Sequence, residues 1–278
     1  MSDRRQDYFC IMNRMIPLFL IIAFAACKND SKEKTPGTRS KEEMPAAVQE
    51  LYRQTAAHPD STGLRWQLID ALDSAGAGSR AMAEIDSLIK KDSLNYGFWY
   101  RKALLQQNYK DTSGALRSFH YAIRIYPSSD ALLAAANLLA ERKDSTALLL
   151  AKQVTSQRIG REYDAHSYFI SGVYYARTHQ PQKAIEAFNA CIANDYTYPE
   201  AYMEKGFIYY EGKQFKEAAQ VFQTLTQIRN TYADGFYWLA KSQEALHDNE
   251  SAITNYQRSL ALDPSIKEAA TALQRLKK

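Results

Sequence analysis

The sequence predicts an all-α fold, an array of helical hairpins, and three observations support this class. Small and aromatic residues recur every 34 residues over most of the chain. Tyrosine is abundant, with 19 residues, whereas there are only 11 glycines and 8 prolines in 278 residues. The apolar fraction of 46% suffices for a core of packed helices. A period of this length is typical of solenoids built from stacked supersecondary units.

The N-terminal 26 residues differ in character from the rest of the chain. A short positive start at residues 12–14 precedes twelve apolar residues, 15–26. This run is too short for a membrane span, which needs about 20 residues, and its flanks are typical of a secretory signal. Residues 1–26 are therefore expected to be a signal peptide, with Met12 as the true start of translation.

Cys27 directly follows the small residues Ala25 and Ala26. This arrangement resembles a bacterial lipoprotein signal, although Phe24 stands where that family carries an aliphatic residue. The resemblance implies cleavage before Cys27 and attachment of lipid to its thiol, which anchors a chain without a membrane-spanning helix. Lys28 after the cysteine implies the outer membrane of the bacterial cell envelope. An ordinary signal peptide with an incidental cysteine is the alternative.

Residues 27–43 are expected to form a flexible tether between this lipid and a folded domain at 44–278. From position 28 to position 43 the chain holds no large apolar side chain, so this segment cannot build a core of its own. The folded domain is then held close to the membrane, where it meets partners at a raised effective concentration.

The repeat is clearest in the second half of the chain. Small residues recur every 34 positions, and an aromatic residue follows the second series after four positions. The first small series is Gly172, Gly206 and Ala240, the second is Ala184, Ala218 and Ala252, and the aromatic series is Phe188, Phe222 and Tyr256. Small residues allow two helices to cross closely, and residues four apart share a helix face. Each period is therefore predicted to be a helical hairpin.

This pattern resembles the tetratricopeptide repeat (TPR) family, whose unit is two antiparallel helices in about 34 residues. The resemblance implies a right-handed superhelix. We expect a lone helix at 44–57, six hairpins from 62 to 266, and a capping helix at 267–278. The last segment has apolar residues on one side and charges on the other, as a terminal cap needs.

The third hairpin departs from the pattern. Residues 130–154 are rich in alanine and leucine and have no aromatic residue at the expected position of the second helix. Residues 158–164 are expected to form a longer connection. Sequence divergence of one repeat, which a solenoid fold tolerates, explains these departures. A bend or hinge at the third hairpin is the alternative.

The sequence nominates no catalytic residue, metal or cofactor, so the protein is expected not to be an enzyme. Cys10, Cys27 and Cys191 are too far apart to suggest disulfides or a metal site, and the five histidines form no ligand motif. Cys191 is expected to be a buried packing residue. Residues 74–80 resemble a phosphate-binding loop but lack its Lys-Ser/Thr ending. The net charge is only +4, and the sequence contains no cluster of basic residues of the kind that binds nucleic acid.

Four Asp-Ser/Thr pairs are expected to cap helix N-termini, because their side chains accept hydrogen bonds from free backbone N–H groups. Some of them also resemble the O-glycosylation sites of one group of bacteria. The pairs are residues 60–61, 73–74, 92–93 and 144–145.

The TPR resemblance implies a concave face lined by the first helix of each hairpin, which binds a protein or peptide. Transferring the family's inner positions to this chain gives Tyr100, Leu104, Phe169, Val173, Arg177, Met203, Phe207, Tyr210, Tyr237, Lys241 and Glu244. Aromatic side chains with a few charges suit an extended peptide or an amphipathic helix. The set lacks the basic clamp that captures a C-terminal carboxylate. Packing of the first helices against one another is the alternative role of these aromatic residues.

The sequence thus predicts a non-catalytic, membrane-tethered adaptor that acts in envelope assembly or maintenance. It is similar in architecture to TPR lipoproteins that assist outer-membrane protein assembly or recruit cell-wall hydrolases. The alternative is a carbohydrate-binding lipoprotein of a glycan-uptake system, although such proteins are usually longer and carry large loop insertions.

Overall fold

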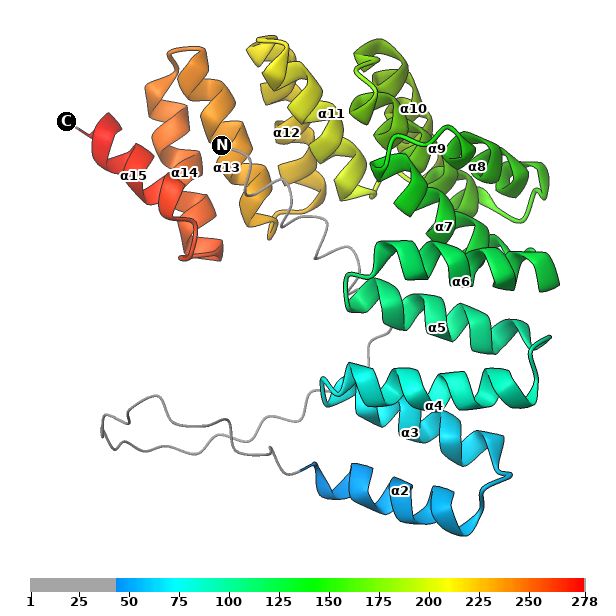
Figure 1. Ribbon diagram of the computed structural model, residues 1–278. Helices are drawn as coiled ribbons and strands as arrows, with labels where there is room; N and C mark the ends of the chain where they lie inside the picture. Colours follow the sequence, from blue (N-terminus) through cyan, green and yellow to red (C-terminus); the bar gives the residue numbers. More distant parts are fainter. Residues whose placement is uncertain (1–43, 278) are drawn as a thin grey trace, which may run out of the picture. The chain divides into compact units, whose positions relative to one another are not determined.

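The computed structural model describes residues 44–277, and this part of the chain forms fourteen helices without a strand (Figure 1). The predicted signal peptide, Cys27 and the tether lie outside the described residues. The helices are α2 (Ala46–Ala57), α3 (Thr62–Ser74), α4 (Gly78–Lys91), α5 (Tyr96–Asn108), α6 (Thr112–Ile125), α7 (Ser129–Glu141), α8 (Thr146–Ser156), α9 (Arg161–Arg177), α10 (Pro181–Asn194), α11 (Pro199–Glu211), α12 (Phe215–Ile228), α13 (Ala233–Ala245), α14 (Asn249–Leu262) and α15 (Lys267–Leu276).

The helices from α3 to α14 form six consecutive hairpins, with α2 before them and α15 after them (Figure 1). We call the first helix of each hairpin helix A and the second helix B. Every connection between α2 and α15 is three or four residues long. Within each compact unit, such short connections make consecutive helices antiparallel neighbours.

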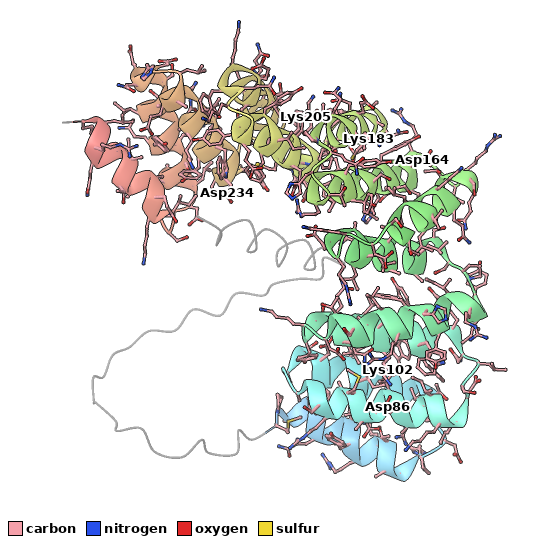
Figure 2. All side chains as sticks on the ribbon, turned by 45° about the horizontal axis from the view of Figure 1, so that its top comes forward. Asp86, Lys102, Asp164, Lys183, Lys205 and Asp234 are labelled. Carbon is pink, nitrogen blue, oxygen red and sulfur yellow. The ribbon has the colours of Figure 1, made fainter. Side chains whose placement is uncertain are left out.

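The chain divides into two compact units. Within the described residues, the N-terminal unit contains 44–94 and 101–115, and the C-terminal unit contains 95–100 and 116–277. In the N-terminal unit α3 packs between α2 and α4, and Lys102 Nζ lies 2.7 Å from Asp86 Oδ1 (Figure 2). In the C-terminal unit each helix from α7 to α15 packs against the next one along the chain.

The recurring small and aromatic residues form the core of the hairpins, as predicted. Gly172 and Gly206 are fully enclosed, and the next helix places an aromatic ring directly over each of them. A Cβ atom on Gly172 would lie 2.5 Å from the Phe188 ring, and one on Gly206 would lie 2.4 Å from the Phe222 ring. Contacts that short do not occur between real carbon atoms, so only glycine fits at these two crossings.

The turn from helix A to helix B is the same in all six hairpins. One residue per turn has a positive φ: Gly76, Lys110, Lys143, His179, Lys213 and His247. The next N–H then donates to the carbonyl five residues earlier, as from Gln214 N to Tyr209 O at 2.9 Å. These are Schellman motifs, which satisfy carbonyl groups at the end of helix A. Residues 74–80 contain the first of these turns, as their position in the period predicted.

The predicted long connection at 158–164 is wrong. The connection covers only residues 157–160, and α9 starts at Arg161 and has 17 residues. Gly160 has φ +141° and redirects the chain just before the helix. Most of the predicted connection is therefore the first turn of α9, which has 17 residues where α7, α11 and α13 have 13, while α8 has only 11.

The predicted cap at residues 60–61 is confirmed, and at residues 144–145 the aspartate, not the N-cap Ser145, bonds the start of the helix. Ser61 Oγ accepts a hydrogen bond at 3.3 Å from the N–H three residues later, and Asp144 Oδ1 accepts one at 2.9 Å from the N–H two residues later. The other two predictions are wrong, because Ser74 ends α3 and Asp92 accepts its hydrogen bond inside a loop. Short polar side chains bond to the backbone at both ends of helices, so the residue pair alone does not fix the end.

The last helix covers the core of the sixth hairpin. Ala269 and Ala272 of α15 lie in one buried cluster with Tyr237 and Tyr256. The opposite side of α15 carries charged residues such as Glu268 and Arg275. This is the arrangement expected of a terminal cap.

Candidate protein-binding face

In the C-terminal unit the A helices contact one another from hairpin to hairpin. Helix α7 packs against α9, and α9 also contacts α11, in addition to the B helices that they adjoin. Contiguous A helices can present their side chains to one extended ligand. We call the solvent-accessible side chains of α7, α9, α11, α13 and α15 the A-helix face.

Five of the residues predicted to line the concave face are buried between helices and are not exposed to solvent. These are Phe169, Val173, Met203, Phe207 and Tyr237, each at most 6% exposed. Their aromatic rings contact the aromatic ring of helix B in the same hairpin, with centroid distances of 5.8–6.0 Å. They therefore pack between helices, which was the alternative role considered for them.

The other six predicted residues are partly exposed: Tyr100, Leu104, Arg177, Tyr210, Lys241 and Glu244. Leu104 belongs to the N-terminal unit and the other five to the C-terminal unit. Burial in a partly apolar environment raises the pKa of Tyr100 to about 12, so this side chain is a neutral hydroxyl at physiological pH. Contact with a partner remains a prediction for all six.

Arg177 joins three consecutive hairpins. It donates to Glu204 of α11 in a bidentate pair, with both distances 3.1 Å, and to Glu141 of α7 at 3.0 Å. Burial lowers the pKa of Arg177, but the charges of Glu204 and Glu141 outweigh burial and raise it above its ordinary value. The guanidinium therefore acts as a fixed internal link and has little capacity left for a ligand.

Lys241 lies among three aromatic rings. Its Nζ is 4.2 Å from the Trp238 ring centroid, 5.2 Å from that of Tyr210 and 5.6 Å from that of Tyr237. Burial lowers the pKa of Lys241, and the charge of Glu244 partly opposes this shift. The rings stabilise the ammonium group by cation–π attraction. Trp238 is the ring nearest to Lys241, and it was not among the positions transferred from the family.

Glu244 is engaged within the chain as well. Its carboxylate accepts a hydrogen bond from the Tyr256 hydroxyl at 2.8 Å and a second from Arg275 of α15. Three predicted charges of the face, at positions 177, 241 and 244, thus make internal contacts. These contacts fix the positions of the three charged groups, which remain partly exposed.

A second set of side chains lies at the N-terminal ends of the same A helices. Titratable residues occupy one register position, 34 residues apart, in the alternate helices α9, α11, α13 and α15: His166, Glu200, Asp234 and Glu268. A tyrosine precedes two of them at the same offset, at positions 198 and 232. Figure 2 labels Asp234 and, at the start of α9, Asp164. The 34-residue spacing reveals this set in the sequence, but its residues are not among the positions transferred from the family.

We call Asp130, His166, Tyr198, Glu200, Tyr232 and Asp234 the Tyr–acid row. Tyr163 connects two of its helices, since its hydroxyl donates to Asp130 Oδ1 at 3.3 Å. The His166 ring lies 6.3 Å from the Tyr198 ring. Burial lowers the pKa of His166, opposed in part by Asp130, so the imidazole is favoured in its neutral form.

Glu200 is the least compensated carboxylate of the row. Its side chain bonds to its own backbone N–H and to no other residue in the described range. Burial raises the pKa of Glu200; Arg229 acts to lower it and Asp195 to raise it. The negative charge of Glu200 in turn contributes to the raised pKa of Tyr198 and Tyr232, for which burial is the largest cause. The carboxylate is therefore kept in an unfavourable environment.

Two further properties concern the described part of the chain alone. None of the helices between residues 44 and 277 combines the length and apolar character of a membrane span. Within the same range, no three His, Cys, Asp or Glu side chains are grouped as metal ligands.

Cys191 is buried, and burial raises the pKa of its thiol, as its predicted packing role requires.

Comparison with known proteins agrees with this architecture. Residues 171–233 match the family model described as tetratricopeptide repeat. The chain is an all-α helical repeat solenoid. A tetratricopeptide repeat protein from Parabacteroides merdae shares this solenoid fold, with a TM-score of 0.64 and 14% identity over 84% of this chain and 91% of that one.

Two more solved structures have the same kind of solenoid. PilW, described as a widely conserved type IV pilus biogenesis factor, matches with a TM-score of 0.63 and 19% identity over 77% of this chain and 97% of its own. Yeast Tom70 matches with a TM-score of 0.54 and 14% identity over 83% of this chain and 57% of its own. These identities show the fold alone. Comparison with the curated protein sequences gave no match.

Proposed function

We propose that this chain is a non-catalytic adaptor that binds a segment of another protein on its A-helix face. One observation carries the proposal: the A helices α7, α9 and α11 contact one another in turn, and ring contacts of Phe207 and Tyr210 with Trp238 join α11 to α13. Such a continuous surface suits an extended polypeptide that crosses several hairpins.

The short connections support protein binding over carbohydrate capture. All connections between α2 and α15 have three or four residues, so this part of the chain has no inserted loop to enclose a sugar. Small-molecule sites are concave and bury most of their ligand. A peptide, in contrast, can be recognised on a face made of helices alone.

We further propose that Cys27 carries a lipid that tethers the solenoid to the bacterial envelope, at the outer membrane, for a role in envelope assembly or maintenance. This part rests on the sequence around Cys27. In the producing bacterium, Cys27→Ser should abolish incorporation of a labelled fatty acid and move the protein from the membrane fraction to the soluble fraction. An unlabelled protein that stays in the soluble fraction without the substitution would refute the tether.

Site-specific photo-crosslinking in cells tests the binding face. A photoreactive amino acid replaces Tyr210 on helix A of the fifth hairpin, and in a matched control it replaces Gln220 on helix B of the same hairpin. We expect a discrete crosslinked protein from position 210 and none from position 220. Equal products from both positions, or none from position 210, would refute an A-helix binding face.

A further inference from the structure

Helix α8 of the third hairpin is rotated relative to the other B helices. In the other five hairpins a fully buried alanine lies five residues after the positive-φ residue of the turn, as Ala218 does after Lys213. In α8 the buried alanine is Ala147, only four residues after Lys143. A shift of one residue corresponds to about 100° of rotation, so α8 turns a different side to its neighbours.

This rotation exposes an apolar side chain in the interior of α8. The sixth residue after the positive-φ residue is apolar in every hairpin. In the other five hairpins it is buried or only partly exposed: Met82, Leu116, Ile185, Ala219 and Ile253. In the third hairpin it is Leu149, which is 68% exposed. Ile159, in the connection after α8, is 47% exposed.

The segment around Leu149 is strongly basic. Residues 142–161 contain five basic residues and one acidic residue, a net charge of +4, which equals that of the whole chain. Lys152 follows Leu149 by three residues and therefore lies on the same side of α8. The other basic residues lie at the two ends of this helix. All five basic side chains are exposed: Arg142, Lys143, Lys152, Arg158 and Arg161.

These five charges are not neutralised within the chain. None of them forms an ion pair with a carboxylate between residues 44 and 277, whereas Arg101, Arg177 and Arg275 do. The single acidic residue of the segment, Asp144, accepts the hydrogen bond that starts α8. The positive charge is therefore available to an external anionic surface.

We infer that this region of the third hairpin docks on the anionic surface of the membrane to which Cys27 tethers the chain. The inference rests on the proposed lipid tether and specifies which part of the solenoid meets the bilayer. We call its exposed side chains the α8 patch: Arg142, Lys143, Leu149, Lys152, Arg158 and Ile159.

The combination of charge and apolar side chains favours a membrane as the partner. Basic residues attract anionic lipid headgroups, and apolar side chains beside them enter the boundary between headgroups and acyl chains. Nucleic acid would engage the charges but would leave Leu149 and Ile159 in water. Two apolar side chains bind a membrane only weakly, so the patch depends on the raised effective concentration that a tether provides.

Fluorescence quenching in vesicles tests the patch. The lipidated full-length protein, as the bacterium produces it, is reconstituted into vesicles of phosphatidylcholine with about one third phosphatidylglycerol, an anionic lipid. A fluorescent amino acid replaces Leu149, and in a matched control it replaces the exposed Gln220 of α12. Lipids with brominated acyl chains should quench position 149 about fivefold more than position 220, because only a docked side chain comes close to the acyl chains.

Two conditions test the electrostatic part of the contact. Quenching at position 149 should be lost in vesicles of phosphatidylcholine alone, which offer no net negative charge. It should also be lost at about 1 M salt, where the Debye length falls to about 3 Å.

Two double variants separate the patch from general charge. Lys152→Gln with Arg158→Gln removes two charges from the patch, whereas Lys213→Gln with Lys216→Gln removes two from the turn and first residues of α12. Each pair includes one residue with positive φ, so their backbone effects are matched. The patch variant should lower the ratio of docked to undocked protein by about thirtyfold, and the control by less than about twofold. Thermal unfolding of both variants confirms that the fold is intact.

Three outcomes overturn the inference: equal quenching at positions 149 and 220, quenching at 149 that persists in neutral vesicles, or equal losses in the two double variants. Flotation of the vesicles distinguishes this failure from that of the tether. A protein that floats with the vesicles but is not quenched at position 149 keeps its tether and loses the docking patch. A protein that does not float refutes the tether, and the inference with it.

Discussion

Single glycines set the distance between the two helices of a hairpin. Gly172 and Gly206 recur with the 34-residue period, and each lies beneath an aromatic ring of helix B. Gly63, in contrast, has no atom within 4 Å of the place where a Cβ would stand. The chain thus contains a close-packed helical glycine and an unconfined one, which allows steric effects to be separated from helix propensity.

Gly206→Ala should destabilise the protein by about 1–3 kcal/mol, because the new methyl group overlaps the Phe222 ring in a tightly packed core. Gly63→Ala should leave the free energy of unfolding unchanged or raise it by up to about 1 kcal/mol, since alanine is the better helix former. Urea denaturation followed by circular dichroism measures both. A Gly206→Ala variant as stable as the Gly63→Ala control would show that the ring moves aside freely.

Glu200 links stability to pH. Burial raises the pKa of Glu200 in the folded state; its own N–H and Arg229 lower it, and Asp195 raises it. A raised pKa means that the stabilising contribution is present below the unfolded value, about 4.3, and is lost as the pH rises through the folded value.

Glu200→Gln should therefore make the protein more stable than the wild type at pH 7. The difference should shrink as the pH falls and vanish below about pH 4, where both side chains are neutral. Thermal unfolding at a series of pH values measures it. A difference that is independent of pH would assign the effect to packing rather than to the buried charge.

At the scale of the helices, Arg177 is the main polar link between hairpins. It joins α9 to α7 and α11, and the Glu204 side chain is only 9% exposed. Loss of the guanidinium leaves this carboxylate buried without its ion pair, whereas removal of both charges leaves an apolar contact.

Arg177→Met should destabilise the protein by about 2–4 kcal/mol, and a double variant with Glu204→Leu should recover most of this loss. Denaturant titrations of the two variants and the wild type give the comparison. A loss for Arg177→Met below about 1 kcal/mol would match an exposed ion pair and contradict the role of a buried link.

The helices were predictable from the sequence because their cores repeat. Glycine, alanine and the following aromatic residue are required wherever two helices cross, so their spacing locates each hairpin. The start of α9 was not predictable in the same way, since it depends on a single conformation at Gly160 that has no counterpart in the other hairpins.

The sequence predicted which helices form the candidate face, but not which of their side chains are accessible. The register that lines a concave face also packs one helix against the next, so Phe169 and Phe207 became core residues. The Tyr–acid row has the same period, but its residue types vary from His166 to Glu200 and Asp234, and a search for identical residues passes over it. Only the coordinates reveal that Glu200 lacks a partner within the described chain.

At the scale of the whole molecule, stability in such an array depends on neighbouring hairpins, and the terminal one needs a cover. Helix α15 supplies it by placing Ile266, Ala269 and Ala272 on the last core. The charges do not follow this period, since α7, α11 and α13 are negative whereas α9 and the B helices α10, α12 and α14 carry no net charge. Packing thus repeats from hairpin to hairpin, while the net charge of the helices does not.

The uniform connections of three or four residues also determine how readily proteases cleave the native protein. Cleavage proceeds most readily at exposed loop tips that can be drawn into an extended strand, and these turns are short and held by backbone hydrogen bonds. Limited digestion should therefore leave residues 46–276 as one fragment, detectable by mass spectrometry, whereas early cuts at the turns would contradict their rigidity.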